Sequence, residues 1–171
     1  MRRMLDRLKQ REGGFTLIEM LVALTITSII GMGATMATVQ IINQGTRNSD
    51  YTTASRNTMN ALYWMSRDAQ MAQVVTLSGG SGFPLTLDWT EWDNTEHEVT
   101  YTFSGDELRR THTVDGDVLN QMLVAQYLEP AETTCVYATG NLTLRVTATL
   151  GEGLNAVTVS KVRGVAPRPG L

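Results

Sequence analysis

The sequence predicts an α+β fold: one long amino-terminal α-helix, half transmembrane and half amphipathic, packed on an antiparallel β-sheet. Three observations lead to this prediction. A basic start is followed by an apolar run without charge. Apolar residues then recur at three- and four-residue spacing to about residue 75, and beyond a glycine-rich break the apolar period becomes two. The 171 residues suffice for one modest domain with an extension.

Charge is distributed unevenly along the chain. The first twelve residues carry five Lys or Arg and two Asp or Glu, whereas the remainder has nine bases against 15 acids. Because no dense basic stripe remains in the body, no nucleic-acid binding is predicted. A basic tip before an apolar segment is instead a topology signal, which places the amino terminus in the cytoplasm.

The apolar run is long enough to cross a membrane. Residues 20–46 contain no charged residue, and a bilayer core takes about 20 apolar residues in a helix. We therefore expect residues 15–42 to span the membrane and the chain after about Asn43 to lie outside. A cleaved secretory signal peptide has the same basic start and apolar core, and composition alone leaves it open. Gly31 and Gly33 are weak points of the helix, each costing about 0.8–1.0 kcal/mol relative to alanine.

The order of residues at the start of the run distinguishes these interpretations. Residues 13–19 read GGFTLIE and lead directly into the apolar run. With the basic residues before it, this stretch resembles the cleavage and methylation motif of type IV prepilins and type II secretion pseudopilins, over about residues 2–42. The resemblance implies a pilin-like fold and a cut between Gly14 and Phe15 by a prepilin peptidase. It also implies N-methylation of Phe15 and a helix that stays in the mature chain.

Glu19 is an acid beside the apolar run. A carboxylate at the bilayer centre costs roughly 2.5–3.5 kcal/mol, and less near an edge, so it needs a partner or must reach the interface. In the resembling family, the partner is the amino terminus of a neighbouring subunit. The resemblance therefore implies that Phe15 and Glu19 make the assembly contact.

A shorter likeness concerns the type of subunit. Residues 61–72, ALYWMSRDAQMA, resemble the corresponding helix of J-type minor pseudopilins and related minor pilins. Glu19 argues against the K-type tip subunit, which usually lacks this glutamate.

The rest of the chain predicts the exported domain. Residues 43–77 have the spacing of an amphipathic helix, with Arg67 and Asp68 expected mostly off the apolar stripe. Gly and Ser at 78–82 predict a loop. Alternating apolar residues then predict antiparallel strands at 85–90, 99–103, 108–114, 142–150 and 156–162, with short strands within 118–137.

No catalytic, cofactor-binding or metal-binding residue is predicted. If Val99 pairs with His112, then His97 and His112 approach within about 7–8 Å across strands, but a zinc site needs three or four ligands. Acidic residues at 88–96 offer oxygen atoms for calcium, with a solvated loop as the simpler interpretation. Cys135, the single cysteine, is expected to be a partly buried apolar residue, with a reactive or intermolecular role as the alternative.

These features predict a non-enzymatic minor pilin or pseudopilin subunit of a type IV pilus or type II secretion pseudopilus. Its parts would be a basic leader (1–14), a transmembrane and filament-core helix (15–42) and an exported domain (43–171). It would be a single-pass protein of the cytoplasmic (inner) membrane and later part of the filament. The resemblance implies a prepilin peptidase and N-methyltransferase, other pilin subunits, an assembly platform and its ATPase as partners. The alternative is a membrane-tethered binding or adhesion module that does not polymerise.

Overall fold

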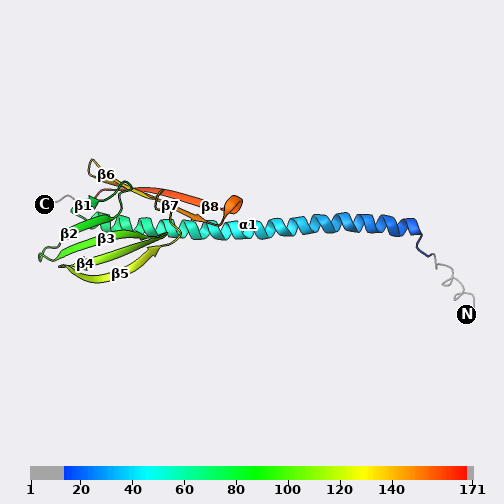
Figure 1. The fold of residues 1–171 in the computed structure, drawn as a ribbon, viewed down its shortest axis with the longest axis horizontal. Helices are drawn as coiled ribbons and strands as arrows, with labels where there is room; N and C mark the ends of the chain where they lie inside the picture. The colour runs from blue at the N-terminus through cyan, green and yellow to red at the C-terminus, as the bar shows by residue number, and fades with distance from the viewer. Residues whose placement is uncertain (1–13, 169–171) are drawn as a thin grey trace, which may run out of the picture. The chain divides into compact units, whose positions relative to one another are not determined.

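The computed structural model describes residues 14–168 (Figure 1). The predicted leader, residues 1–14, lies outside the described residues except for Gly14. The described chain forms one long helix, α1 (Leu17–Met71), and antiparallel strands that pack against it, which confirms the α+β, pilin-like prediction. The described residues divide into two compact units, one up to Gly45 and one from Thr46.

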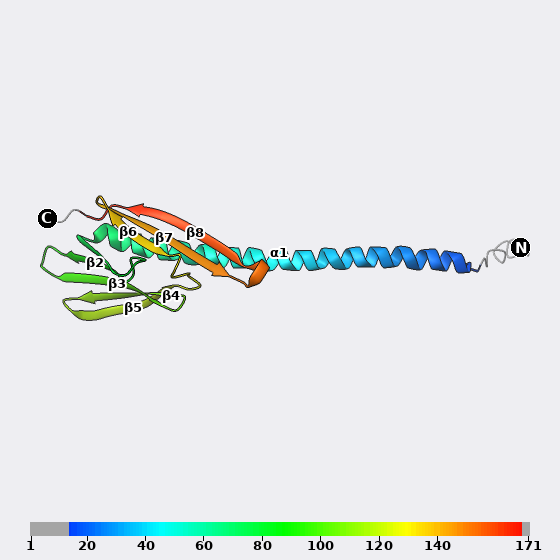
Figure 2. The ribbon, with the colours of Figure 1, turned by 45° about the horizontal axis from the view of Figure 1, so that its top comes forward.

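The strands of the second unit form two antiparallel sheets where one was predicted. The larger sheet has the order β1-β2-β3-β4-β5 and comprises β1 (Val74–Leu77), β2 (Leu85–Thr90), β3 (Glu96–Ser104), β4 (Glu107–Val114) and β5 (Asp117–Ala125). The smaller sheet comprises β6 (Thr134–Ala138), β7 (Asn141–Leu150) and β8 (Val157–Val165), with a short 3-10 turn at Gly153–Asn155. Figures 1 and 2 show β2–β5 on one side of α1 and β6–β8 on the other.

The second half of α1 is therefore buried from two sides. Small residues on this part of the helix allow both sheets to approach its backbone, while Leu62 and Met65 fill the space between them. The sheets contribute the inward-facing residues of their alternating strands, among them Leu85, Leu87, Val99, Tyr101, Leu108, Leu142, Leu144 and Val146, all with no exposed surface. One core thus joins the helix to both sheets.

The helix ends six residues earlier than predicted. Residues 74–77 were expected to continue the amphipathic helix to 77, but they form β1, which pairs antiparallel with β2 from Val74↔Asp88 to Leu77↔Leu85. The prediction was wrong because the spacing of the Val and Leu residues in 74–77 is compatible with both a helix and an edge strand. The pairing with β2, which lies beyond the loop, decides between them.

The other predicted strands are present. Short strands were expected within 118–137, and β5 and β6 occupy most of that stretch. The glycine-rich loop between β1 and β2 brings Gly82 against β6, where the amide of Cys135 donates to the Ser81 carbonyl at 2.8 Å. Gly82 has φ +83, and a Cβ built on it would lie 2.2 Å from the Cys135 carbonyl oxygen. This position requires glycine on both counts.

Candidate functional site

The first turn of α1 is closed by a reciprocal pair of polar side chains. Thr16 precedes the first helical residue, and its backbone N–H and hydroxyl donate to Glu19 Oε2 at 2.9 and 2.8 Å. The Glu19 backbone N–H donates to the Thr16 hydroxyl oxygen at 3.3 Å. This is a capping box, formed by Thr at the helix start and Glu three residues later. The sequence TLIE therefore sets where the helix begins.

Gly14 and Phe15 lie just before this turn. Neither residue belongs to a helix or strand, both are exposed, and Phe15 retains 83% of its surface. The Gly14–Phe15 peptide bond therefore lies in open chain next to the helix start. The residues brought together here are those predicted for cleavage and assembly, while the basic part of the leader falls outside the described residues.

The helix that follows has the surface of a membrane-crossing segment. It is long and apolar enough to cross a membrane, and its most apolar stretch has no buried residue. Its hydroxyl groups donate to carbonyls three or four residues earlier, for example Thr27 to Ala23 and Ser28 to Leu24. Such bonds satisfy polar groups inside lipid without another chain. The helix runs without interruption through Gly31 and Gly33.

The comparison with protein families addresses this same region. The model of the prokaryotic N-terminal methylation motif matches residues 9–35. The chain therefore carries the amino-terminal motif found in the type IV pilin and pseudopilin superfamily. The match covers the end of the leader, the helix start and most of the apolar run, and it does not reach the sheets. No curated protein and no solved structure matches the chain.

A buried ionic cluster in this prepilin-type protein was not predicted. Asp68 was expected mostly off the apolar stripe of the helix, but it is only 3% exposed, so that expectation was wrong. Arg110 on β4 donates to it through Nε at 2.7 Å and Nη2 at 3.1 Å, and the Tyr101 hydroxyl on β3 also donates to it. The pKa of Tyr101 is raised above its usual value, mainly by burial and secondly by the nearby Asp68. The burial of Asp68 could have been predicted from the sequence, because Asp68 lies three residues after the buried Met65 and therefore on the same helix face.

The two histidines meet as predicted. Val99 pairs with His112, and His97 Nδ1 lies 3.1 Å from His112 Nε2. The other ring nitrogen of His97 lies 3.3 Å from Glu91 Oε1, and the Trp89 ring stacks on His97 with centroids 5.0 Å apart. The short N···N contact requires one protonated nitrogen and one lone pair, so the two rings share a hydrogen bond.

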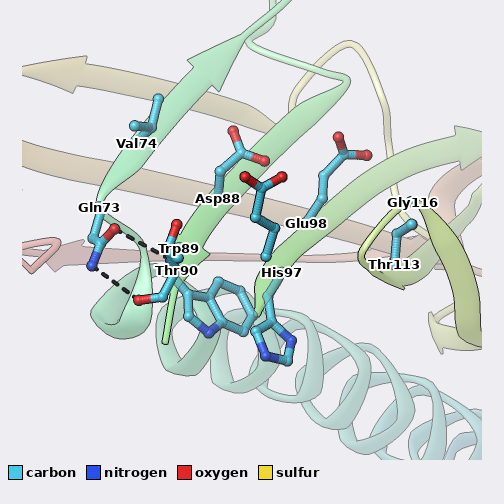
Figure 3. Close-up of a pocket in the computed structure, with 10 residues that line it drawn as sticks. Gln73, Val74, Asp88, Trp89, Thr90, His97, Glu98, Thr113 and Gly116 are labelled. Carbon is cyan, nitrogen blue, oxygen red and sulfur yellow. Dashed lines mark hydrogen bonds between the residues drawn. The ribbon is translucent and has the colours of Figure 1, made fainter. Parts of the chain in front are cut away.

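A hollow of about 370 Å³ lies at this end of the larger sheet (Figure 3). Figure 3 shows the rings of Trp89 and His97 on the α1 side of β2 and β3, and the carboxylates of Asp88 and Glu98 on the opposite side. These two acids are direct cross-strand partners. Burial, then Glu98, raise the pKa of Asp88. At the end of β2, the side-chain amide of Gln73 donates to the Thr90 carbonyl and accepts from the Thr90 backbone N–H.

The remaining candidates are a metal site, the acidic loop and Cys135. Within residues 14–168 no group of three or more His, Cys, Asp or Glu side chains is placed to hold a metal ion. Asp93 in the acidic loop accepts from the Thr95 backbone N–H at 3.1 Å, a bond within its own turn. Cys135 is 4% exposed, and burial raises the pKa of its thiol to about 12. It is thus a buried apolar residue with little thiolate at neutral pH.

Proposed function

We propose that the chain is a non-enzymatic subunit of a type IV pilus or type II secretion pseudopilus, cut after Gly14 and methylated at Phe15. The observation that carries the proposal is the methylation motif, matched over residues 9–35 at the start of an apolar helix. The exposed chain at Gly14 and Phe15 supports access by a peptidase.

The proposed topology follows from the charge and the apolar run. The basic leader, residues 1–14, lies in the cytoplasm. Residues 15–42 cross the inner membrane before assembly and line the filament core afterwards, and residues 43–171 are exported. The partners are a prepilin peptidase and N-methyltransferase, sibling pilins, an assembly platform and its ATPase.

The proposed assembly contact joins Glu19 to the amino terminus of a neighbouring subunit. Cleavage creates an ammonium group on Phe15, which a carboxylate in a low-dielectric region attracts strongly. In each chain, the backbone N–H and the hydroxyl of Thr16 both donate to Glu19 Oε2, and Oε1 accepts no hydrogen bond from any described residue. One carboxylate oxygen therefore remains for the incoming ammonium while the other holds the helix start.

Within the superfamily we propose a minor subunit most similar to the J-type pseudopilins. The support is the likeness of residues 61–72 to that group and the presence of Glu19, which the K-type tip subunit usually lacks. The alternative is a tethered binding module that keeps the membrane helix and never polymerises.

Replacing Glu19 with glutamine tests whether the protein is a filament subunit or a tethered binding module. Glutamine also completes a capping box, so Glu19→Gln retains the helix start and removes only the charge. Glu96→Gln, in an exposed strand residue of the second unit, is the matched control. In the native cell, both variants should be processed to the same amino terminus as the wild type. We expect Glu19→Gln alone to lower the amount of subunit recovered in sheared filaments at least tenfold. Equal recovery of both variants, or no wild-type subunit in filaments, would favour the tethered module.

A further inference from the structure

A groove of about 290 Å³ lies where α1 meets β2, β4 and β5. Its walls include the indoles of Trp64 and Trp89, the guanidinium groups of Arg67 and Arg110, and the amide of Asn120. We call it the Trp64 groove. It lies wholly within the second unit and has no part in the contact between Phe15 and Glu19.

The charge of the Trp64 groove is positive. Both guanidinium groups lie beside the Trp64 ring, with Cζ of Arg67 at 5.5 Å and Cζ of Arg110 at 5.6 Å from its centroid. Asp68 is the only carboxylate among the residues that line the groove, and it is paired with Arg110 and Tyr101. Arg67 makes no ion pair or hydrogen bond with any of residues 14–168, so its charge is uncompensated.

Two residues that line the groove have side-chain donors without an acceptor among the described residues. Trp89 is 8% exposed, and its Nε1 is the one buried side-chain nitrogen or oxygen among the described residues that lacks a partner. Asn120 makes no side-chain hydrogen bond in the described part of the chain. Burial, then Arg110, lower the pKa of His112, which also lines the groove. Of these groups, the buried Trp89 N–H is the one that an added acceptor would satisfy.

The size of the groove limits the occupant. Pockets for small molecules usually enclose about 300–1,000 Å³, so this groove is at the lower limit and suits one amino-acid side chain or chain end. Its positive charge stands out because the chain beyond its first twelve residues has nine bases against 15 acids. An acidic group from another protein would therefore be attracted here more than to the rest of the surface.

We propose that the Trp64 groove binds a carboxylate presented by another polypeptide chain, either an Asp or Glu side chain or a chain-terminal carboxylate. The free Arg67 guanidinium binds the carboxylate through two parallel N–H donors, as arginine does with planar anions. The aliphatic part of the bound residue lies against the Trp64 ring. This site adds a partner contact to the proposed filament subunit and holds equally for a tethered protein.

NMR spectroscopy of the full chain, labelled with ¹⁵N-tryptophan and dissolved in detergent micelles, tests the proposal through the indole N–H signals. Three probes are titrated at constant ionic strength: N-acetyl-glutamate methylamide, N-acetyl-leucine with a free carboxylate, and neutral N-acetyl-glutamine methylamide. Trp92 is 94% exposed and is absent from the lining of the groove, so it serves as an internal control. We expect the carboxylate probes to shift the Trp64 and Trp89 indole signals, with the neutral probe and Trp92 showing no comparable shift. Tighter binding of N-acetyl-glutamate methylamide would indicate a side-chain carboxylate as the natural occupant, and tighter binding of N-acetyl-leucine would indicate a chain-terminal carboxylate.

Two variants complete the test. Arg67→Gln should weaken binding of the acid at least about tenfold, because a charge-assisted pair is lost. Arg109→Gln, in an exposed arginine of β4 paired with Glu107, should leave binding unchanged. Since Arg67 is exposed and unpaired among the described residues, its replacement should leave the Trp92 signal unaltered and the fold intact. Equal shifts with all three probes, or binding in Arg67→Gln equal to the wild type, would overturn the proposal.

Discussion

The buried pair of Asp68 and Arg110 gives a sharp prediction for stability. Asp68→Asn retains the shape of the side chain but replaces one acceptor oxygen with a donor that faces Arg110. Arg110 is 7% exposed and donates two of its N–H groups to Asp68, so its charge would be left buried without a partner. Removing one member of such a pair costs about 3–5 kcal/mol. For a unit of this size, we expect the midpoint of thermal unfolding to fall by about 10–20 °C.

The control for this prediction is the pair of Arg109 and Glu107 on the same strand, in which Arg109 is exposed and Glu107 is half-buried. Glu107→Gln should cost about 0–1 kcal/mol, because exposed ion pairs contribute little. The double variant Asp68→Leu with Arg110→Met removes both charges and should be destabilised by less than the sum of the single changes.

Urea unfolding of the full chain in micelles, followed by tryptophan fluorescence, compares the wild type with Asp68→Asn, Glu107→Gln, the double variant and its two single variants, Asp68→Leu and Arg110→Met. Trp64 lies beside Arg110 and reports directly on the pair. A stability loss in Asp68→Asn no larger than that in Glu107→Gln would contradict the prediction. So would a loss in the double variant at least as large as the sum of the losses in its two single variants.

Two further predictions concern a glycine and a histidine of the second unit. Gly82→Ala should destabilise the fold by more than Gly105→Ala, because both residues have positive φ but only Gly82 would place a Cβ against the Cys135 carbonyl; thermal unfolding of the two variants compares them. His112 should titrate below its usual pKa of 6.5 because of burial and Arg110, so the unfolded chain gains its proton at higher pH than the folded chain. Stability from this group should thus be lost as the pH falls through about 6.5, as NMR titration and unfolding at several pH values can establish, and a His112 pKa above 6.5 would contradict the assignment.

Local patterns predicted much of this fold. The alternation along β2, β3 and β4 set which residues face α1, and the hairpin register that placed Val99 opposite His112 followed from the short turn between β3 and β4. The helix was predicted to begin at Phe15, whereas it begins at Leu17, and the capping box of Thr16 and Glu19 emerged only from the geometry. These features depend on residues close together in the chain.

Features that depend on distant residues were missed. Whether residues 74–77 continue a helix or form a strand depends on β2, which lies beyond a loop. The burial of Asp68 depends on Arg110, 42 residues later, because a carboxylate tolerates the core only with such a partner. The division of the strands into two sheets likewise depends on which partners β6 finds, and no local pattern records this.

The most direct test of the account is the mature amino terminus. Intact mass and amino-terminal sequencing of the protein from its native membrane, beside a Gly14→Ala variant, would identify it. We predict a chain that starts at N-methylated Phe15 and a variant that remains uncut. A wild-type chain that is uncut, or that starts beyond residue 40, would contradict processing as a prepilin and favour the tethered or secreted alternatives.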